Sequence, residues 1–154
     1  MKRIIDKLLK LDKTISTMES CTGWALANSI TNVENSSMIF KFWLVTYSNE
    51  AKMKFGVKKE IITRYSVYSI EVAREMSKNI SKFADSDYGV WITGKLNRID
   101  INNPRGEDNE VFVSIYDREN DKYNDIKLEV PFNNRAENKE FVVKKVIEEL
   151  LRIM

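Results

Sequence analysis

Residues 13–30 read KTISTMESCTGWALANSI and change character twice within a short stretch. Lys13–Thr17 is typical of a short strand, and the largely apolar run from Trp24 to Ile30 is suited to a buried helix. The polar stretch Glu19–Gly23 lies between the two. Ser20 is therefore predicted at a strand-to-helix junction, and the unit as a whole indicates an α/β fold.

More helices and strands are predicted on either side of this unit. Residues 4–11 carry apolar side chains at helical spacing, as an amphipathic surface helix would. Met38–Tyr47 is rich in aromatic and β-branched residues, which favour a strand buried on both faces. Ser48–Asn49 and Ser69 are candidate N-caps for the next two helices. The second of these helices would turn five apolar residues inward: Val72, Ala73, Met76, Ile80 and Phe83.

The second half of the chain predicts a strand, a loop and a hairpin. Asp87–Thr93 is typical of a strand. Lys95–Asn109 is polar and contains proline and glycine, so we expect a long loop beside any functional site. Glu110–Tyr116 and Tyr123–Val130 are expected to pair as a hairpin.

A stripe of apolar residues predicts a closing helix from about Arg135. Helices that alternate with strands before a late hairpin predict one domain over residues 1–154. The expected fold is a three-layer α/β/α domain with a mixed, mainly parallel sheet.

The charges are nearly balanced, with 25 Lys and Arg against 23 Asp and Glu and a net charge of +2. The electrostatic field of such a chain is weak, so no nucleic-acid partner is expected. No apolar run approaches the roughly 20 residues that a bilayer span needs, so no membrane partner is expected. The single cysteine, Cys21, cannot form an internal disulfide, and the amino terminus lacks a signal-peptide pattern. A cytoplasmic location is therefore predicted.

Histidine is absent from the chain. This removes the commonest general base and the commonest ligand of catalytic zinc. Any catalysis would have to use serine, cysteine, lysine, tyrosine or carboxylate side chains.

Three stretches resemble the CinA C-terminal (nicotinamide-nucleotide amidase) family: Glu19–Gly23, Val45–Lys52 and Val72–Met76. The second, Val-Thr-Tyr-Ser-Asn-Glu-Ala-Lys, is the most specific. No gap separates Glu19 from Lys52, and the family's Ile-Thr, Ser-Ser and Phe fall at Ile30-Thr31, Ser36-Ser37 and Phe40. Thr93-Gly94 matches the start of the family's glycine-rich loop, and Asn134-Arg135 resembles the Asp-Arg before its last helix.

The resemblance implies a mixed five-stranded sheet between helices. It also implies an amidase that hydrolyses nicotinamide mononucleotide to nicotinic acid mononucleotide and ammonia with a serine and a lysine. The partner would be a small-molecule nucleotide substrate, no metal or organic cofactor is implied, and a homodimer is suggested. Some members carry a further amino-terminal domain that acts on nucleotide pyrophosphates, and that second activity is expected to be absent here.

Carried over residue by residue, the resemblance makes Ser20 the nucleophile, Lys52 its general base and Tyr47 a hydrogen-bonding partner that helps to pass the proton. A serine hydroxyl needs a neighbour to take its proton, and a desolvated, neutral lysine can do so with a lowered pKa. Six further residues would contact the substrate: Cys21, Thr22, Gly23, Thr93, Gly94 and Arg135.

Each of these residues also has an interpretation without chemistry. Ser20 could be a helix N-cap and Lys52 an ordinary exposed lysine. Tyr47 fits packing in an apolar strand, and Cys21 is interpreted as a structural thiol because no histidine accompanies it. Arg135 could cap or dock the final helix, or meet a phosphate.

The amides of Thr22 and Gly23 are expected to be unpaired donors at the start of the helix. They could stabilise a tetrahedral oxyanion or hold a nucleotide phosphate, and both readings stay open.

The chain departs from the family pattern at several glycines. Trp24, Asn35 and Trp43 stand where the family has glycine, and Lys95–Asp100 replaces its Ile-Ala-Gly-Pro-Gly-Gly loop. Lys95 and Arg98 could change the ligand, strengthen a phosphate contact or simply belong to a solvated loop. An alternative function is therefore a non-catalytic homologue that binds a nucleotide or a protein partner. A third idea, DNA uptake, follows only from the family's competence-linked name.

Overall fold

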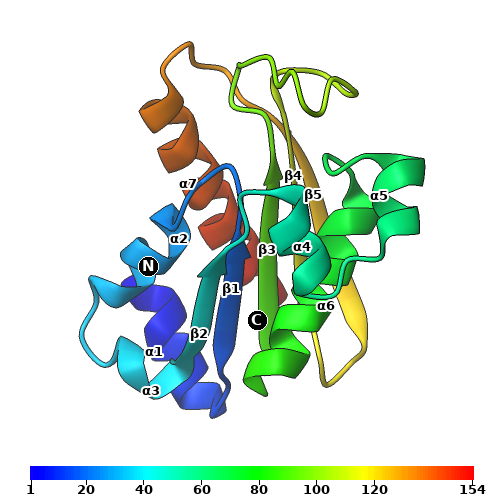
Figure 1. The fold of residues 1–154 in the computed structure, drawn as a ribbon. Helices are drawn as coiled ribbons and strands as arrows, with labels where there is room; N and C mark the ends of the chain where they lie inside the picture. Colours follow the sequence, from blue (N-terminus) through cyan, green and yellow to red (C-terminus); the bar gives the residue numbers. More distant parts are fainter.

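A five-stranded sheet forms the middle of the molecule in the computed structural model, which describes all of residues 1–154 (Figure 1). The strands follow the order β2-β1-β3-β4-β5. β1 pairs in parallel with β2 and β3, whereas β4 pairs antiparallel with β3 and β5. β4 alone therefore runs against the other strands, and the expected mixed, mainly parallel five-stranded sheet is confirmed.

The elements have these bounds: α1 Lys2–Leu11, β1 Ile15–Glu19, α2 Ala25–Thr31, α3 Ser36–Ile39, β2 Phe40–Val45, α4 Asn49–Lys54, α5 Lys59–Tyr65, α6 Ile70–Ala84, β3 Tyr88–Gly94, β4 Glu110–Asp117, β5 Lys122–Glu129 and α7 Arg135–Ile153.

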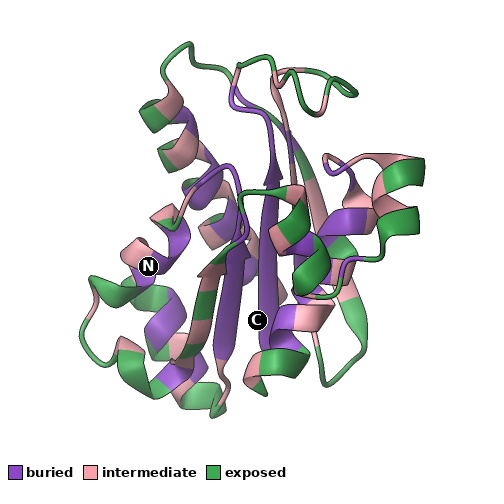
Figure 2. Cartoon of the chain, in the orientation of Figure 1, coloured by how far each residue is buried: buried purple, intermediate pink, exposed green.

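Helices cover both faces of the sheet (Figure 1). On one face, Leu8 of α1, Leu26 of α2 and Val146 of α7 join a buried apolar cluster with Val90 and Ile115 of the sheet. On the other face, a second cluster packs α6 against Met18 of β1 and Trp91 of β3. The three-layer α/β/α arrangement is therefore confirmed, with β1 and β3 buried along their whole length (Figure 2).

Polar side chains start the helices as the sequence predicts. The Ser48 Oγ accepts a hydrogen bond from the Ala51 amide at 3.1 Å, so Ser48 caps α4. The Ser69 Oγ accepts from the Val72 amide at 3.3 Å and caps α6. The hairpin β4–β5 and the long loop before it are also found. None of the helices is both long and apolar enough to cross a membrane.

Several local predictions are wrong. β2 is an edge strand whose residues alternate between half-buried and exposed, because only β1 pairs with it. Trp43 of this strand is 53% exposed and stacks on Phe40. The Phe83 side chain of α6 is 63% exposed, and its ring contacts the rings of Phe42 and Phe55. Helix α5 was not predicted; none of its residues is fully buried, so it lacks a strong apolar pattern.

Candidate active site

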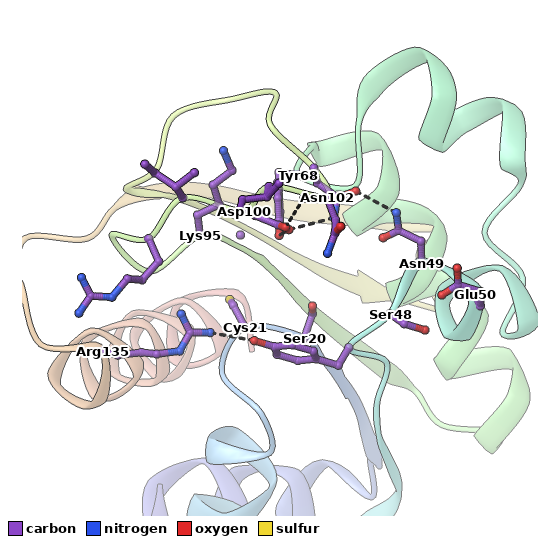
Figure 3. A pocket seen from close by; sticks show the side chains of 16 residues that line it. Ser20, Cys21, Ser48, Asn49, Glu50, Tyr68, Lys95, Asp100, Asn102 and Arg135 are labelled. Carbon is purple, nitrogen blue, oxygen red and sulfur yellow. Dashed lines mark hydrogen bonds between the residues drawn. The ribbon is translucent and has the colours of Figure 1, made fainter.

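A cavity of about 740 Å³ opens at the carboxyl ends of the three parallel strands. Ser20 follows β1, Tyr47 follows β2 and Gly94 ends β3, and all three residues line the cavity. The end of a parallel sheet where strand order reverses is the usual ligand site of such folds. We call the part formed by the β1–α2 turn and the β2–α4 connection the floor, and residues 95–109 the roof loop (Figure 3).

Ser20 and Lys52 meet in the floor. The Lys52 Nζ lies 3.4 Å from the Ser20 Oγ, and both residues are buried, with Lys52 only 2% exposed. The same Nζ donates to the carbonyl oxygens of Thr46 at 3.0 Å and Tyr47 at 3.4 Å. Lys52 does not itself line the cavity, and it forms no ion pair with a carboxylate.

Burial lowers the pKa of Lys52 to about 8, because desolvation penalises the ammonium form. The negative charges of Asp100 and Glu50 oppose this effect. A neutral lysine has two N–H bonds and one lone pair. The two carbonyls can take both N–H bonds, which leaves the lone pair for the Ser20 hydroxyl to donate to.

Backbone and side-chain hydrogen bonds fix the position of Ser20. Its amide donates to the Ile92 carbonyl of β3 at 3.0 Å. The preceding residue, Glu19, is fully buried and accepts hydrogen bonds from the Thr22 hydroxyl and from the amides of Leu26 and Ala27. This carboxylate ties the end of β1 to the first turn of α2, so the turn that carries Ser20 is held at both ends.

The expected unpaired amide at Gly23 is not found. α2 begins only at Ala25, and the Gly23 amide donates to the Ser20 carbonyl at 3.1 Å within the preceding turn. The amides of Cys21 and Thr22 donate to no backbone or side-chain oxygen. The donors available beside Ser20 are therefore those of Cys21 and Thr22, one position earlier than the sequence predicts.

Trp24 holds the position at which the family has glycine, with a left-handed φ of 75°. That conformation explains the glycine, since a side chain is disfavoured there. The Trp24 ring is 56% exposed and does not line the cavity. This substitution therefore leaves the cavity open.

Tyr47 and Arg135 meet at one side of the cavity. The Arg135 Nη2 donates to the Tyr47 hydroxyl at 3.3 Å, and Tyr47 is 68% exposed. The Tyr47 side chain makes no hydrogen bond to Ser20 or Lys52; its backbone carbonyl contacts Lys52 instead. A proton-passing role for Tyr47 stays a prediction.

The remaining predicted substrate contacts divide into two groups. Cys21 and Gly94 line the cavity, together with Arg135. Thr22, Gly23 and Thr93 do not, and the Thr93 hydroxyl is buried against the Val67 carbonyl at 3.0 Å. Gly94 lies so close to β4 that a Cβ would come within 2.4 Å of the Glu110 carbonyl oxygen.

Burial raises the pKa of the Cys21 thiol to about 12, which disfavours the thiolate that a nucleophile requires.

The roof loop was expected to be solvated, but Lys95 is buried and 4% exposed. Its Nζ pairs with Asp108 at 3.0 Å and donates to the carbonyls of Gly106 at 3.0 Å and Pro104 at 3.4 Å. Lys95 therefore holds the loop together from inside, whereas Arg98 is exposed at the cavity wall as predicted.

Sequence reasoning missed Tyr68, Asp100, Asn103 and Asn49, which also line the cavity. The Tyr68 hydroxyl and the Asn103 side chain both donate to Asp100, and Asn49 donates to Asn103 at 2.8 Å. The length and polarity of the loop signalled Asp100 and Asn103, whereas Asn49 was predicted only as an N-cap and nothing in the sequence signalled Tyr68. No group of three carboxylate or thiol side chains lies close enough together to hold a metal ion.

Comparison with known proteins places this geometry in context. A model of the CinA C-terminal domain matches residues 1–154. A CinA-like protein of Endomicrobium trichonymphae is 48% identical over 88 residues, which are 56% of this chain and 21% of that protein. One from Kosmotoga olearia is 46% identical over 92 residues, 59% of this chain and 22% of that protein. These matches span less than a quarter of the length of either curated relative.

Solved structures resemble nearly the whole chain. The competence/damage inducible protein of Agrobacterium tumefaciens superposes with a TM-score of 0.88 at 26% identity, over 98% of this chain and 91% of that one. A competence-damaged protein superfamily member from Escherichia coli gives 0.86 at 25% identity, over 97% and 85%.

Proposed function

The chain belongs to the CinA C-terminal domain family, and we propose that it is an amidohydrolase that converts nicotinamide mononucleotide to nicotinic acid mononucleotide and ammonia. One observation carries the proposal. A buried lysine without a carboxylate partner lies 3.4 Å from a serine hydroxyl at the wall of a cavity. A serine beside an amine that can lose its proton is an arrangement able to activate the hydroxyl for nucleophilic attack on an amide.

In the first half of the reaction, the Ser20 Oγ attacks the carboxamide carbon while its proton passes to the Lys52 Nζ. The tetrahedral adduct carries a negative oxygen, and the free amides of Cys21 and Thr22 are the available donors for it. Lys52 then returns the proton to the departing nitrogen. The C–N bond breaks, ammonia leaves, and the acyl group stays on Ser20.

In the second half, water replaces ammonia. Lys52 takes a proton from the water as it attacks the acyl carbon, and gives that proton to the Ser20 oxygen as the ester bond breaks. The product leaves as a carboxylic acid, which gives its proton to the released ammonia in solution, so carboxylate and ammonium result. The serine and the neutral lysine are restored, and water is the only co-substrate.

Arg135 and the exposed Arg98 are the cations at the cavity wall that a nucleotide phosphate would meet. Arg135 engages only the Tyr47 hydroxyl, so its remaining N–H groups are free for an anion. This assignment supports a mononucleotide rather than a neutral amide as substrate.

The test is the formation of ammonia and nicotinic acid mononucleotide by the purified chain supplied with nicotinamide mononucleotide. Ser20→Ala and Lys52→Met are each expected to lower kcat by about 10³-fold or more. The matched control is Lys54→Met on the same helix, because Lys54 is exposed and lies outside the cavity.

Turnover that persists in Ser20→Ala would contradict the proposal, as would a wild-type chain that binds the nucleotide without hydrolysing it. The second result would favour the non-catalytic alternative, and it can be read from a ligand-dependent shift in melting temperature.

A further inference from the structure

The roof loop places a carboxylate across the cavity from the nucleophile. Asp100 lines the same cavity as Ser20, and Figure 3 shows it on the loop above Ser20 and Cys21, with Arg135 to one side. Asp100 lies in Lys95–Asp100, the stretch at which the chain departs from the glycine-rich loop of the family pattern described above. The cavity is thus lined by cationic and anionic side chains together, with Asp100 as the carboxylate that the roof loop contributes.

Three donors hold the Asp100 carboxylate in place. The Tyr68 hydroxyl and the Asn103 Nδ2, at 2.9 Å, donate to Oδ2, and the Asn102 amide donates to Oδ1 at 3.0 Å. Partial burial raises the pKa of Asp100, but these hydrogen bonds outweigh it and hold the pKa below the ordinary value. The carboxylate is therefore ionised at neutral pH.

Asp100 has hydrogen-bond donors but no counter-charge. No lysine or arginine forms an ion pair with it. Of the cations that line the cavity, Lys95 pairs with Asp108 and Arg135 contacts Tyr47, while Arg98 of the same loop makes no hydrogen bond or ion pair. The negative charge at the roof is thus available to a ligand.

The roof loop is built to keep this charge where it is. Two backbone hydrogen bonds join the two ends of the loop. The Lys95 amide donates to the Glu110 carbonyl at 2.9 Å, and the Asn97 amide donates to the Asp108 carbonyl at 2.8 Å. Asn49 of α4 ties Asn103 to the floor at 2.8 Å. A charge fixed in advance interacts with a ligand without a cost of ordering at the moment of binding.

We propose that Asp100 selects a substrate with a positively charged ring, so that the cavity takes the oxidised pyridinium mononucleotide in preference to its neutral, reduced dihydropyridine form. The proposal rests on the proposed function, because the carboxamide at Ser20 brings the attached ring beneath the roof. The nicotinamide ring carries one positive charge only when it is oxidised. Tyr47, which lines the same cavity and is 68% exposed, offers an aromatic ring that also favours a cationic ligand.

The test measures binding rather than turnover. In a Ser20→Ala chain, titration calorimetry compares nicotinamide mononucleotide with its reduced form. The oxidised form is expected to bind roughly 10-fold more tightly, and Asp100→Asn should bring the ratio near one by weakening the oxidised form alone. Asp117→Asn is the matched control. Asp117 accepts from Asn120 in a similar turn at the far end of the sheet, so its substitution should leave the ratio unchanged.

A second variant guards against a structural effect of the substitution. Tyr68→Phe removes a donor to Asp100 but keeps the charge and the ring, so the preference for the oxidised form should persist. Equal losses for both ligands in Asp100→Asn, or a ratio near one in the Ser20→Ala parent, would overturn the inference.

Turnover by the wild-type chain is measured separately, so the two proposals can fail independently. Hydrolysis without a charge preference keeps the amidase and overturns the role of Asp100. A charge preference without hydrolysis supports the role of Asp100 and overturns the amidase.

Discussion

Two lysines near the cavity are buried, Lys52 in the floor and Lys95 in the roof, and their partners differ. Lys52 in the floor has two backbone carbonyls and a serine hydroxyl around its Nζ, with no carboxylate. Lys95 in the roof has two backbone carbonyls and the Asp108 carboxylate. One arrangement favours a neutral amine and the other an ion pair. Burial alone therefore does not define a lysine's role; the third partner does.

The largest expected effect is on amidase activity, because Lys52 has to lose its proton for catalysis and Lys95 does not. Lys52→Arg keeps a cation and its donors, but a guanidinium stays protonated at any working pH. We expect amidase activity to fall about 10³-fold or more, whereas Lys95→Arg should stay within about threefold. Steady-state kinetics on both variants makes the comparison. An active Lys52→Arg chain would remove the general base from the mechanism.

The second expected effect concerns stability. The pKa of Lys52 is about 8 in the folded chain and 10.5 for an ordinary lysine. Between these values the unfolded state binds more protons, so the free energy of unfolding should rise with pH. Relative to Lys52→Met, the wild type should gain about 2 to 3 kcal/mol from pH 8 to 10.5. Urea unfolding at several pH values measures it, and parallel curves for the two proteins would refute the lowered pKa.

The third expected effect tests the roof. Lys95→Met removes the internal anchor of the loop but leaves Ser20 and Lys52 untouched. The KM for nicotinamide mononucleotide should rise about 10-fold while kcat changes less than about threefold, because the loop contributes binding rather than chemistry. The loop should also be cut faster by a protease. A large fall in kcat at unchanged KM would instead make the roof part of the catalytic step.

A smaller effect couples the two regions. The amidase rate should rise with pH through about 8, because Lys52 must lose its proton to accept that of Ser20. The negative charge of Asp100 raises the pKa of Lys52, so Asp100→Asn should move this rise to lower pH. Rate profiles of the two proteins from pH 6 to 10 provide the measurement. A rise that moves to higher pH would contradict the coupling.

The smallest expected effect lies in the turn beside the floor. Trp24→Gly relieves a left-handed backbone at a side chain that is 56% exposed and outside the cavity. Stability should increase by up to about 1 kcal/mol, and kcat/KM should stay within about twofold. Thermal unfolding and kinetics test both parts. A marked change in activity would mean that Trp24 reaches the substrate after all.

The floor could be predicted from the sequence much better than the roof. The strand–turn–helix unit around Ser20 and the Val45–Lys52 stretch carry local patterns and a family resemblance, and the structure brings Ser20 and Lys52 together. The roof depends on side-chain bonds between distant segments, such as Tyr68 with Asp100. No periodicity or motif marks such pairs.

Burial was also hard to infer where position in the sheet decides it. The Met38–Tyr47 stretch has the composition of a central strand, yet β2 lies at the edge because only β1 pairs with it. Lys95 looks like any loop lysine until the chain folds back over it. Both errors arise because the environment of a residue is set by segments that are remote in sequence.

Because the two ends of the roof loop are hydrogen-bonded to each other, much of the loop can be replaced as one unit. Its two ends meet at the Lys95–Glu110 hydrogen bond, where Gly94 allows the strands to approach closely. Leu96 belongs to the buried apolar core and Asn97 donates to the carbonyls of Val130 and Phe132, so these residues stay with the framework. Residues 98–109 could therefore be exchanged for the loop of a relative while the framework that aligns serine and lysine is kept. Substrate range could then evolve, or be engineered, by insertion and replacement at one junction, while the reaction itself is inherited unchanged.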